Sequence, residues 1–97
     1  NRLQNDTFID KVMPVEPIAD KWRAFGWHVI EIDGHHMTQI VEVLELALTI
    51  KGIPTVIIAN TIKGKGISYM EDDNAWHQKA PTREQYELAL QELGAGR

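Results

Sequence analysis

The sequence predicts an α/β protein built around a β-strand, an α-helix and a second, parallel β-strand. Residues 27–32 and 54–60 are rich in β-branched and other apolar side chains, and a turn or loop with glycine follows each run. Between them, residues 37–50 repeat apolar side chains at helical spacing. Because short links join these segments, we expect a βαβ unit with a right-handed crossover, flanked by helices.

Length sets the limits of this prediction. Ninety-seven residues make at most one small domain. Two parallel strands do not form a stable sheet alone, so we expect further strands from residues before Asn1 or from another chain. The chain begins with Asn1 rather than Met, and we therefore expect it to be a fragment of a longer protein.

Charge, cysteine content and hydropathy argue against several classes of protein. The net charge of −4 disfavours a nucleic-acid-binding or anionic-membrane-binding surface. The lack of cysteine rules out disulfides, thiolate metal sites and cysteine nucleophiles, and it fits a reducing cytoplasm. No apolar run approaches the ~20 residues that span a bilayer. We expect a cytoplasmic protein without nucleic-acid or membrane partners.

The first quarter of the chain should hold one short helix. Residues 1–16 show no helical or strand period and are typical of a loop, in which Asn1 would ordinarily be a frayed terminus. Residues 17–25 predict a helix with Pro17 at its first position and Gly26 just past its end. Its apolar face would consist of Ile18, Trp22 and Phe25, which we expect to pack in the core.

The central helix has a poor start and a clear end. His36 occupies the cap position, where Asp, Asn, Ser or Thr would be preferred, and Thr38 could cap a slightly later start. Lys51 in the last turn and Gly52 beyond it should end the helix. The predicted buried stripe comprises Met37, Ile40, Val41, Leu44, Ala47 and Leu48.

The second strand leads into the longest connection of the chain. Residues 54–60 form an apolar, β-branched run, so we expect a strand buried on both faces. Residues 62–81 follow without a regular period, and a connection of about 20 residues is unusual unless it is functional. A capping box, Thr-Arg-Glu-Gln, then starts a helix at 82–93, and residues 94–97 form a tail. That helix should bury Tyr86, Ala89, Leu90 and Leu93.

The long connection carries the best candidates for chemistry. Lys63-Gly64-Lys65-Gly66 follows the second strand, and glycine lets a backbone approach a phosphate while lysine supplies charge; a solvated turn is the alternative. His77 is a candidate catalytic residue, because loop histidines on rigid scaffolds are well suited to proton transfer. The other histidines, His28, His35 and His36, lack metal-ligand spacing.

Four segments, taken together and in this order, resemble transketolases. They are Asp20-Lys21-Trp22-Arg23-Ala24-Phe25-Gly26-Trp27-His28-Val29, Ile32-Asp33-Gly34-His35, Thr61-Ile62-Lys63-Gly64-Lys65-Gly66-Ile67, and Trp76-His77 with Ala80-Pro81. The resemblance is to the thiamine-diphosphate-binding N-terminal domain, or to the N-terminal subunit of split enzymes, and it covers essentially the whole chain. It implies that residues 1–97 are the C-terminal part of such a domain, with a parallel-sheet fold.

The resemblance implies an enzyme that transfers a two-carbon ketol unit between sugar phosphates, as in the pentose phosphate pathway, using thiamine diphosphate and Mg²⁺ or Ca²⁺. Asn1 and the backbone carbonyl of Leu3 match the family's metal ligands, which replaces the interpretation of Asn1 as a frayed terminus; oxygen ligands suit such cations. Asn1, Lys63 and His77 match cofactor-binding residues. His77 also matches a histidine that hydrogen-bonds the substrate oxygen and shuttles a proton, which makes it the expected catalytic residue.

The sequence departs from the family pattern at three positions. Thr7, His36 and Gln78 stand where the family usually has glycine, aspartate and glycine. Loss of a cap aspartate at 36 should cost the helix about 0.5–2 kcal/mol, and Gln78 takes φ > 0 less readily than glycine. The family's Gly-Asp-Gly motif, its upstream histidines and its activating glutamate are absent from this chain, so we expect the isolated chain to be inactive.

Two other interpretations stay open. A thiamine enzyme of the 1-deoxyxylulose-5-phosphate synthase type shares the Lys-Gly-Lys-Gly loop. A non-catalytic remnant would serve only in the association of subunits. On the main interpretation, the expected partners are sugar-phosphate substrates and either a second copy, which would give a homodimer, or a complementary C-terminal transketolase subunit.

Overall fold

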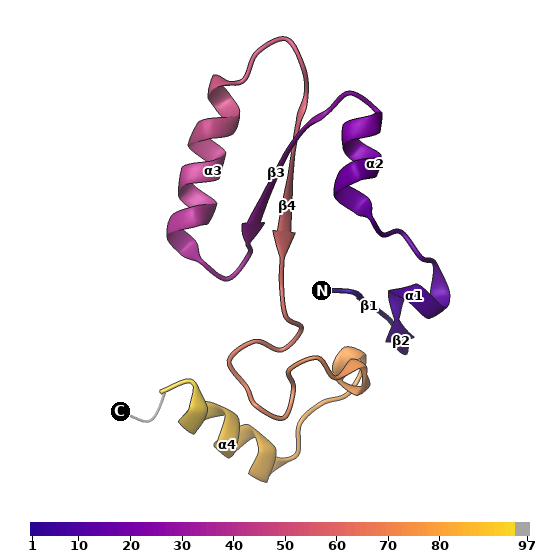
Figure 1. The fold of residues 1–97 in the computed structure, drawn as a ribbon. Helices are drawn as coiled ribbons and strands as arrows, with labels where there is room; N and C mark the ends of the chain where they lie inside the picture. Colours follow the sequence, from indigo (N-terminus) through magenta and orange to yellow (C-terminus); the bar gives the residue numbers. More distant parts are fainter. Residues whose placement is uncertain (95–97) are drawn as a thin grey trace. The chain divides into compact units, whose positions relative to one another are not determined.

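The computed structural model describes residues 1–94 (Figure 1). They divide into two compact units: residues 14–61 form one, and residues 1–13 together with those from 62 onward form the other. The tail expected at 94–97 lies, beyond Gly94, outside the described residues.

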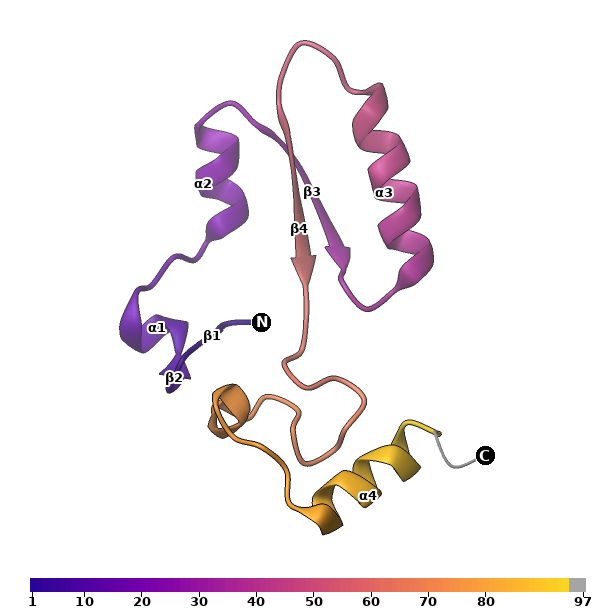
Figure 2. The same ribbon diagram turned by 180° about the vertical axis from the view of Figure 1, so that it is seen from behind.

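The unit 14–61 contains the predicted βαβ motif. Strand β3 (His28–Asp33) pairs in parallel with β4 (Thr55–Asn60), with the first residues of the two strands opposite each other. Helix α3 (Met37–Thr49) connects the strands along one side, and α2 (Ile18–Ala24) lies on the other; Figure 2 shows the same order from behind. The prediction of an α/β fold with a parallel sheet flanked by helices is confirmed.

The second strand is less buried than the sequence predicted. Residues 55–58 are half-buried, and Ala59 and Asn60 are exposed. Among the described residues, β3 and β4 make up their entire sheet, so neither strand has a second neighbour to exclude water. The apolar composition typical of a central strand is therefore present without the cover that such a strand normally has.

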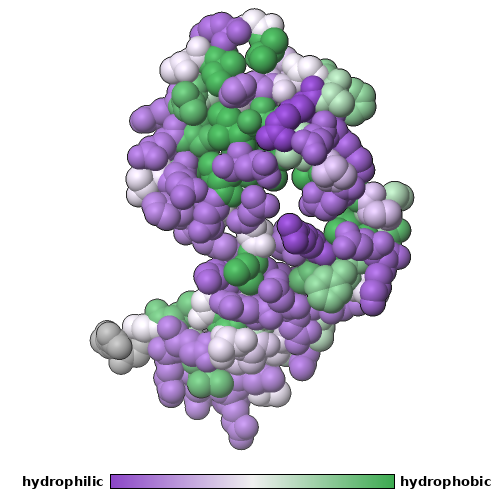
Figure 3. Space-filling view, viewed as in Figure 1, coloured by the Kyte–Doolittle hydropathy of each residue, from purple (hydrophilic) through white to green (hydrophobic). Residues whose placement is uncertain are grey.

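Helix α3 covers only part of the predicted stripe. Val43 is 4% exposed, and Ile40 and Ala47 on the same side are half-buried. Most of the predicted stripe is exposed, and hydrophobic residues are visible on the surface of this unit in Figure 3. The exposed members of the stripe are Met37, Val41, Leu44 and Leu48, the last of them 73% exposed. Because apolar residues lie on both sides of α3, periodicity alone did not identify the side that meets the sheet.

The helix ends show the effect of the local sequence. His36 is the N-cap of α3, and its Nδ1 accepts a hydrogen bond from the Gln39 backbone N–H at 3.3 Å. The His36 side chain thus caps the N-terminus of α3, which begins at Met37. The alternative start capped by Thr38 is therefore wrong. Pro17 is the N-cap of α2 rather than its first helical residue, and Gly26 follows that helix with φ +86°, as expected at this position.

Two further expectations for this unit need correction. Phe25 is 81% exposed, whereas Trp22 packs edge-on against Trp27 with 4.8 Å between the ring centroids. Lys51 lies past the last turn of α3, whose C-cap is Ile50. The aromatic face of α2 is therefore only partly used in packing, and no basic side chain lies in the last turn of α3.

The N-terminal residues are more regular than predicted. A short antiparallel hairpin, β1 (Leu3–Gln4) and β2 (Thr7–Phe8), replaces the expected loop and leads directly into α1 (Ile9–Val12). Strands of two residues are too short to show a period, which is why the pattern missed them. Asn5 has φ +50° in the turn, a conformation that asparagine tolerates better than most residues.

The long connection and the last helix complete the second unit. Residues 62–73 are mostly turns, η1 (Asn74–His77) is a 3-10 helix, and α4 (Arg83–Glu92) has the predicted capping box between Thr82 and Gln85. In the predicted stripe, Ala89 is buried and Leu90 half-buried, whereas Tyr86 and Leu93 are exposed. Every helix within residues 1–94 is too short or too polar to cross a membrane.

Candidate functional site

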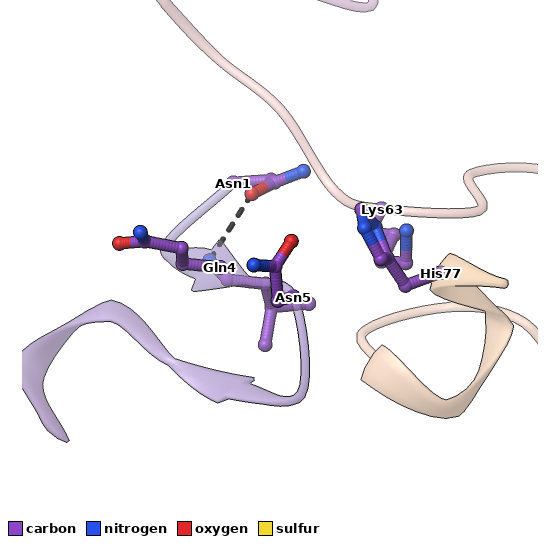
Figure 4. Close-up of a pocket in the computed structure, with 6 residues that line it drawn as sticks. Asn1, Gln4, Asn5, Lys63 and His77 are labelled. Carbon is purple, nitrogen blue, oxygen red and sulfur yellow. Dashed lines mark hydrogen bonds between the residues drawn. The ribbon is translucent and has the colours of Figure 1, made fainter. Parts of the chain in front are cut away.

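A cavity of about 300 Å³ lies in the unit formed by residues 1–13 and the residues from 62 onward. It brings together all four residues that the sequence singled out for cofactor, metal or catalysis. Two further polar residues, which the sequence analysis did not assign, complete its lining. The lining consists of Asn1, Leu3, Gln4, Asn5, Lys63 and His77 (Figure 4).

One wall of the cavity is the N-terminal hairpin. The Oδ1 atom of Asn1 accepts a hydrogen bond from the Leu3 backbone N–H at 3.1 Å, drawn as a dashed line in Figure 4. This contact fixes the Asn1 side chain next to the backbone of Leu3. An amide oxygen has two lone pairs, so Asn1 Oδ1 retains one for a further donor or a cation.

The opposite wall begins with Lys63, a half-buried residue. Its backbone carbonyl accepts a hydrogen bond from the Asp72 N–H at 3.0 Å, which closes residues 63–72 into a loop. Gly64 has φ +72°, and a Cβ there would lie 2.5 Å from the carbonyl oxygen of Met70. The glycine beside Lys63 is therefore required by the close approach of two backbone segments.

His77 reaches the same cavity from the end of η1. Asp73 caps this helix by accepting from the Ala75 N–H at 2.9 Å. Trp76 donates its indole Nε1–H to the carbonyl of Tyr69 at 3.0 Å, and the Tyr69 hydroxyl donates to the carbonyl of Gln85 at 2.6 Å. These two part-buried bonds attach η1 to the loop and the loop to α4, so they fix the position from which His77 projects.

A further bond joins the two walls. The Nδ2 amide of Asn74, the first residue of η1, donates to the backbone carbonyl of Asp6 in the hairpin turn. Nothing in the sequence pattern pointed to this contact, because the two residues are 68 positions apart. It places the turn that carries Asn5 beside the helix that carries His77.

The loop is also attached to the end of α4. The backbone N–H and the hydroxyl of Ser68 donate to the two oxygens of the Glu92 carboxylate, each at 2.6 Å. Both hydrogen bonds lower the pKa of Glu92 below its ordinary value, because both favour the ionised carboxylate. The bond from the Ser68 hydroxyl has the larger effect, and the bond from its backbone N–H the smaller. A second carboxylate, Glu71, accepts from the Gly66 N–H at 3.1 Å and lies 3.8 Å from the Lys65 ammonium.

The lining suits an anionic ligand accompanied by a divalent cation. Lys63 supplies positive charge, while Asn1 Oδ1 and the carbonyl of Leu3 are neutral oxygens of the kind that Mg²⁺ and Ca²⁺ accept. Within residues 1–94, no group of three or more His, Cys, Asp or Glu side chains is arranged to hold a metal ion. A cation in this cavity would therefore need additional oxygens from the anionic ligand itself, as Mg²⁺ bound to phosphates does.

The other three histidines lie elsewhere. His28 is in β3, and His35 and His36 precede α3, all in the unit 14–61. None of them lines the cavity. Gln78, one of the departures noted in the sequence, is the C-cap of η1 with φ −131°, a conformation open to any residue. This position therefore does not need the freedom of glycine.

The comparisons agree on one family. A family model described as "Transketolase, thiamine diphosphate binding domain" matches residues 2–96. The chain is 46% identical over 93 residues to a 6-deoxy-6-sulfo-D-fructose transketolase subunit of Clostridium sp. (strain MSTE9), covering 96% of this chain and 34% of that protein. It is 42% identical over 93 residues to an apulose-4-phosphate transketolase subunit of Phocaeicola vulgatus, covering 96% and 33%. Against the transketolase of Rattus norvegicus, identity is 39% over 79 residues, covering 81% and 12%. The chain thus spans about a third of the length of the subunit relatives.

Proposed function

Because the chain belongs to the transketolase family, through the thiamine diphosphate binding domain of that family, we propose that it forms part of an enzyme that transfers a two-carbon ketol unit between sugar phosphates. The observation that carries this proposal is the cavity in which Asn1, Leu3, Lys63 and His77 meet. Asn1 and Leu3 come from the N-terminus and Lys63 and His77 from the second half of the chain, so their meeting at one cavity is a property of the fold.

Each of the four residues has a proposed role. Lys63 attracts the diphosphate of the cofactor, because its ammonium is the positive side chain of the lining. Asn1 and the Leu3 carbonyl hold Mg²⁺ or Ca²⁺ on the other wall. His77 is the catalytic residue, which donates a hydrogen bond to the substrate oxygen and moves a proton at that atom. Thiamine diphosphate, when bound, supplies carbanion stabilisation that no protein side chain provides.

The rest of the site is proposed to come from outside this chain. The chain spans about a third of the subunit relatives and 12% of the Rattus norvegicus transketolase. We therefore propose that it works as the C-terminal part of a larger cofactor domain, in a cytoplasmic protein that acts as a homodimer or with a complementary C-terminal subunit. Three relatives are named as transketolase subunits, which favours the second arrangement. The isolated chain should be inactive.

A donor-and-acceptor assay on the full-length protein, with its partner subunit where one exists, tests the proposal. The donors should include a ketose phosphate and a sulfonated ketose, because the relatives' names refer to sugars of both kinds. Formation of a chain-extended sugar phosphate, such as sedoheptulose phosphate, without pyruvate supports ketol transfer. A requirement for pyruvate would favour the 1-deoxyxylulose-5-phosphate synthase type, and failure to bind thiamine diphosphate would favour the non-catalytic remnant.

A further inference from the structure

Asn5 is a polar lining residue of the cavity without a role in the assignments above. Figure 4 shows its carboxamide pointing toward Asn1, on the hairpin side of the gap that faces Lys63 and His77. Asn5 is exposed, and its carboxamide takes part in none of the hydrogen bonds that hold the two walls of the cavity within residues 1–94. A group in this position is available to a ligand that enters the cavity.

The backbone of Asn5 is held firmly. Gln4 and Thr7 are paired across the hairpin, which leaves Asn5 and Asp6 as a two-residue turn. Asn5 has φ +50°, and the carbonyl of Asp6 accepts the side chain of Asn74. Helix η1 begins at Asn74 and ends at His77. The bond from Asn74 to Asp6 therefore positions the hairpin turn relative to the histidine.

The chemistry of a carboxamide indicates what Asn5 would contact. Asparagine both donates and accepts hydrogen bonds, as a hydroxyl group does, whereas a phosphate at neutral pH chiefly accepts them. Lys63 already provides the charge for an anionic group. We propose that Asn5 is a specificity-determining residue, whose carboxamide hydrogen-bonds a hydroxyl group of the sugar substrate beside His77. This proposal rests on the ketol-transfer function proposed above.

The positive φ of Asn5 allows a clean test. Glycine adopts this conformation readily, so Asn5→Gly removes the carboxamide and keeps the turn. Asp72 provides the control for the backbone change: it has φ +54°, is exposed and lies outside the cavity lining. Asp72→Gly keeps the backbone N–H that donates to the Lys63 carbonyl, so the loop that carries Lys63 retains its closing bond. Asn5→Asp is a second variant that tolerates the same φ and retains acceptor oxygens but loses the N–H donors.

Calorimetry of the full-length protein, loaded with thiamine diphosphate and Mg²⁺, measures the binding of an aldose phosphate acceptor, which does not react while no ketose donor is present. Asn5→Gly should weaken sugar-phosphate binding, and raise its KM, about 10-fold, as expected for a hydrogen bond worth about 1.4 kcal/mol. The affinity for thiamine diphosphate and the Tm should stay the same as in Asp72→Gly. Among analogues of the sugar phosphate that each lack one hydroxyl group, one should bind the native protein about 10-fold more weakly than the complete sugar does. Asn5→Gly should bind that analogue and the complete sugar with equal affinity.

Two results would overturn the assignment. One is sugar-phosphate binding by Asn5→Gly that equals that of Asp72→Gly. The other is a loss confined to thiamine diphosphate binding, which would assign Asn5 to the cofactor instead. Both results are distinct from failure of the proposed function, which would appear as a native protein without ketol transfer. In that case, sugar-phosphate binding by the native protein and by Asn5→Gly would still test the role of Asn5.

Discussion

The side chain of Asn74 is hydrogen-bonded to the backbone carbonyl of Asp6, and this contact joins the two walls of the candidate site. Asp6 belongs to the turn after Asn5, and Asn74 begins the 3-10 helix that ends at His77. The groups that would meet the ligand are thus positioned by a bond between residues that do not themselves line the cavity. Loss of this bond should therefore affect ligand binding more than fold.

Replacing Asn74 with alanine tests this role. Asn74→Ala in the full-length protein should raise the KM for the sugar phosphate several-fold, because the hairpin turn is released from η1. The free energy of unfolding should fall by about 0.5–1.5 kcal/mol, the usual value of one hydrogen bond. Gln91→Ala, an exposed position on α4, is the control. Equal KM values for the two variants would show that the contact does not organise the site.

His77→Gln should separate chemistry from binding. Glutamine can still donate a hydrogen bond but cannot shuttle a proton at neutral pH, so kcat should fall by about 10²–10⁴-fold. The Kd for thiamine diphosphate should change far less. His35→Gln, exposed and outside the cavity, should retain native kcat. Steady-state kinetics with the full-length protein measure both, and a native kcat for His77→Gln would remove His77 from catalysis.

The cap of α3 gives a prediction about stability. His36 accepts the Gln39 N–H through Nδ1, but aspartate is a better cap and adds favourable negative charge at a helix N-terminus. His36→Asp should therefore raise the free energy of unfolding by about 0.5–1 kcal/mol, and His36→Ala should lower it by about 0.5–2 kcal/mol. Urea unfolding of the full-length protein measures both changes. A more stable alanine variant would show that His36 does not cap the helix.

The contact between Ser68 and Glu92 predicts a pH dependence. Two hydrogen bonds from Ser68 lower the pKa of Glu92 in the folded state, so this carboxylate stabilises the fold fully above its unfolded pKa. Its contribution is lost as the pH falls through the lower, folded pKa. NMR titration should find the pKa of Glu92 below 4.5 in the native protein, and Ser68→Ala should move it upward. An unchanged Glu92 pKa in Ser68→Ala would contradict the assigned cause.

Sequence patterns predicted the βαβ motif well, because strand and helix periods are local properties. The capping box of Thr82 and Gln85 and the glycine after α2 followed from the same local rules. The buried side of α3 was predicted only in part: Ile40 and Ala47 lie on the covered side, but Met37 and Leu48 do not. Apolar residues lie on both sides of the helix, and only the neighbouring strands determine which side is covered. Tertiary context decides such cases.

The candidate site was predictable only in part. Resemblance to a family pointed to Asn1, Leu3, Lys63 and His77, and the fold brings these four to one cavity. Asn5 was missed because a two-residue turn between two-residue strands has no period. Its one signal was an Asn-Asp pair, which is typical of turns but says nothing about what the turn faces.

A comparison of Lys63 with Lys65 tests whether the cavity binds the cofactor. Both lysines lie in one loop, but Lys63 lines the cavity, whereas Lys65 is exposed and pairs with Glu71 at 3.8 Å. Calorimetric titration of the full-length protein with thiamine diphosphate and Mg²⁺ should find binding about 10–100-fold weaker in Lys63→Met, since bonds to charged groups contribute about 1.5–3 kcal/mol. Lys65→Met should bind like the native protein. Native affinity in Lys63→Met, or equal losses in both variants, would show that the cavity beside Lys63 does not hold the diphosphate.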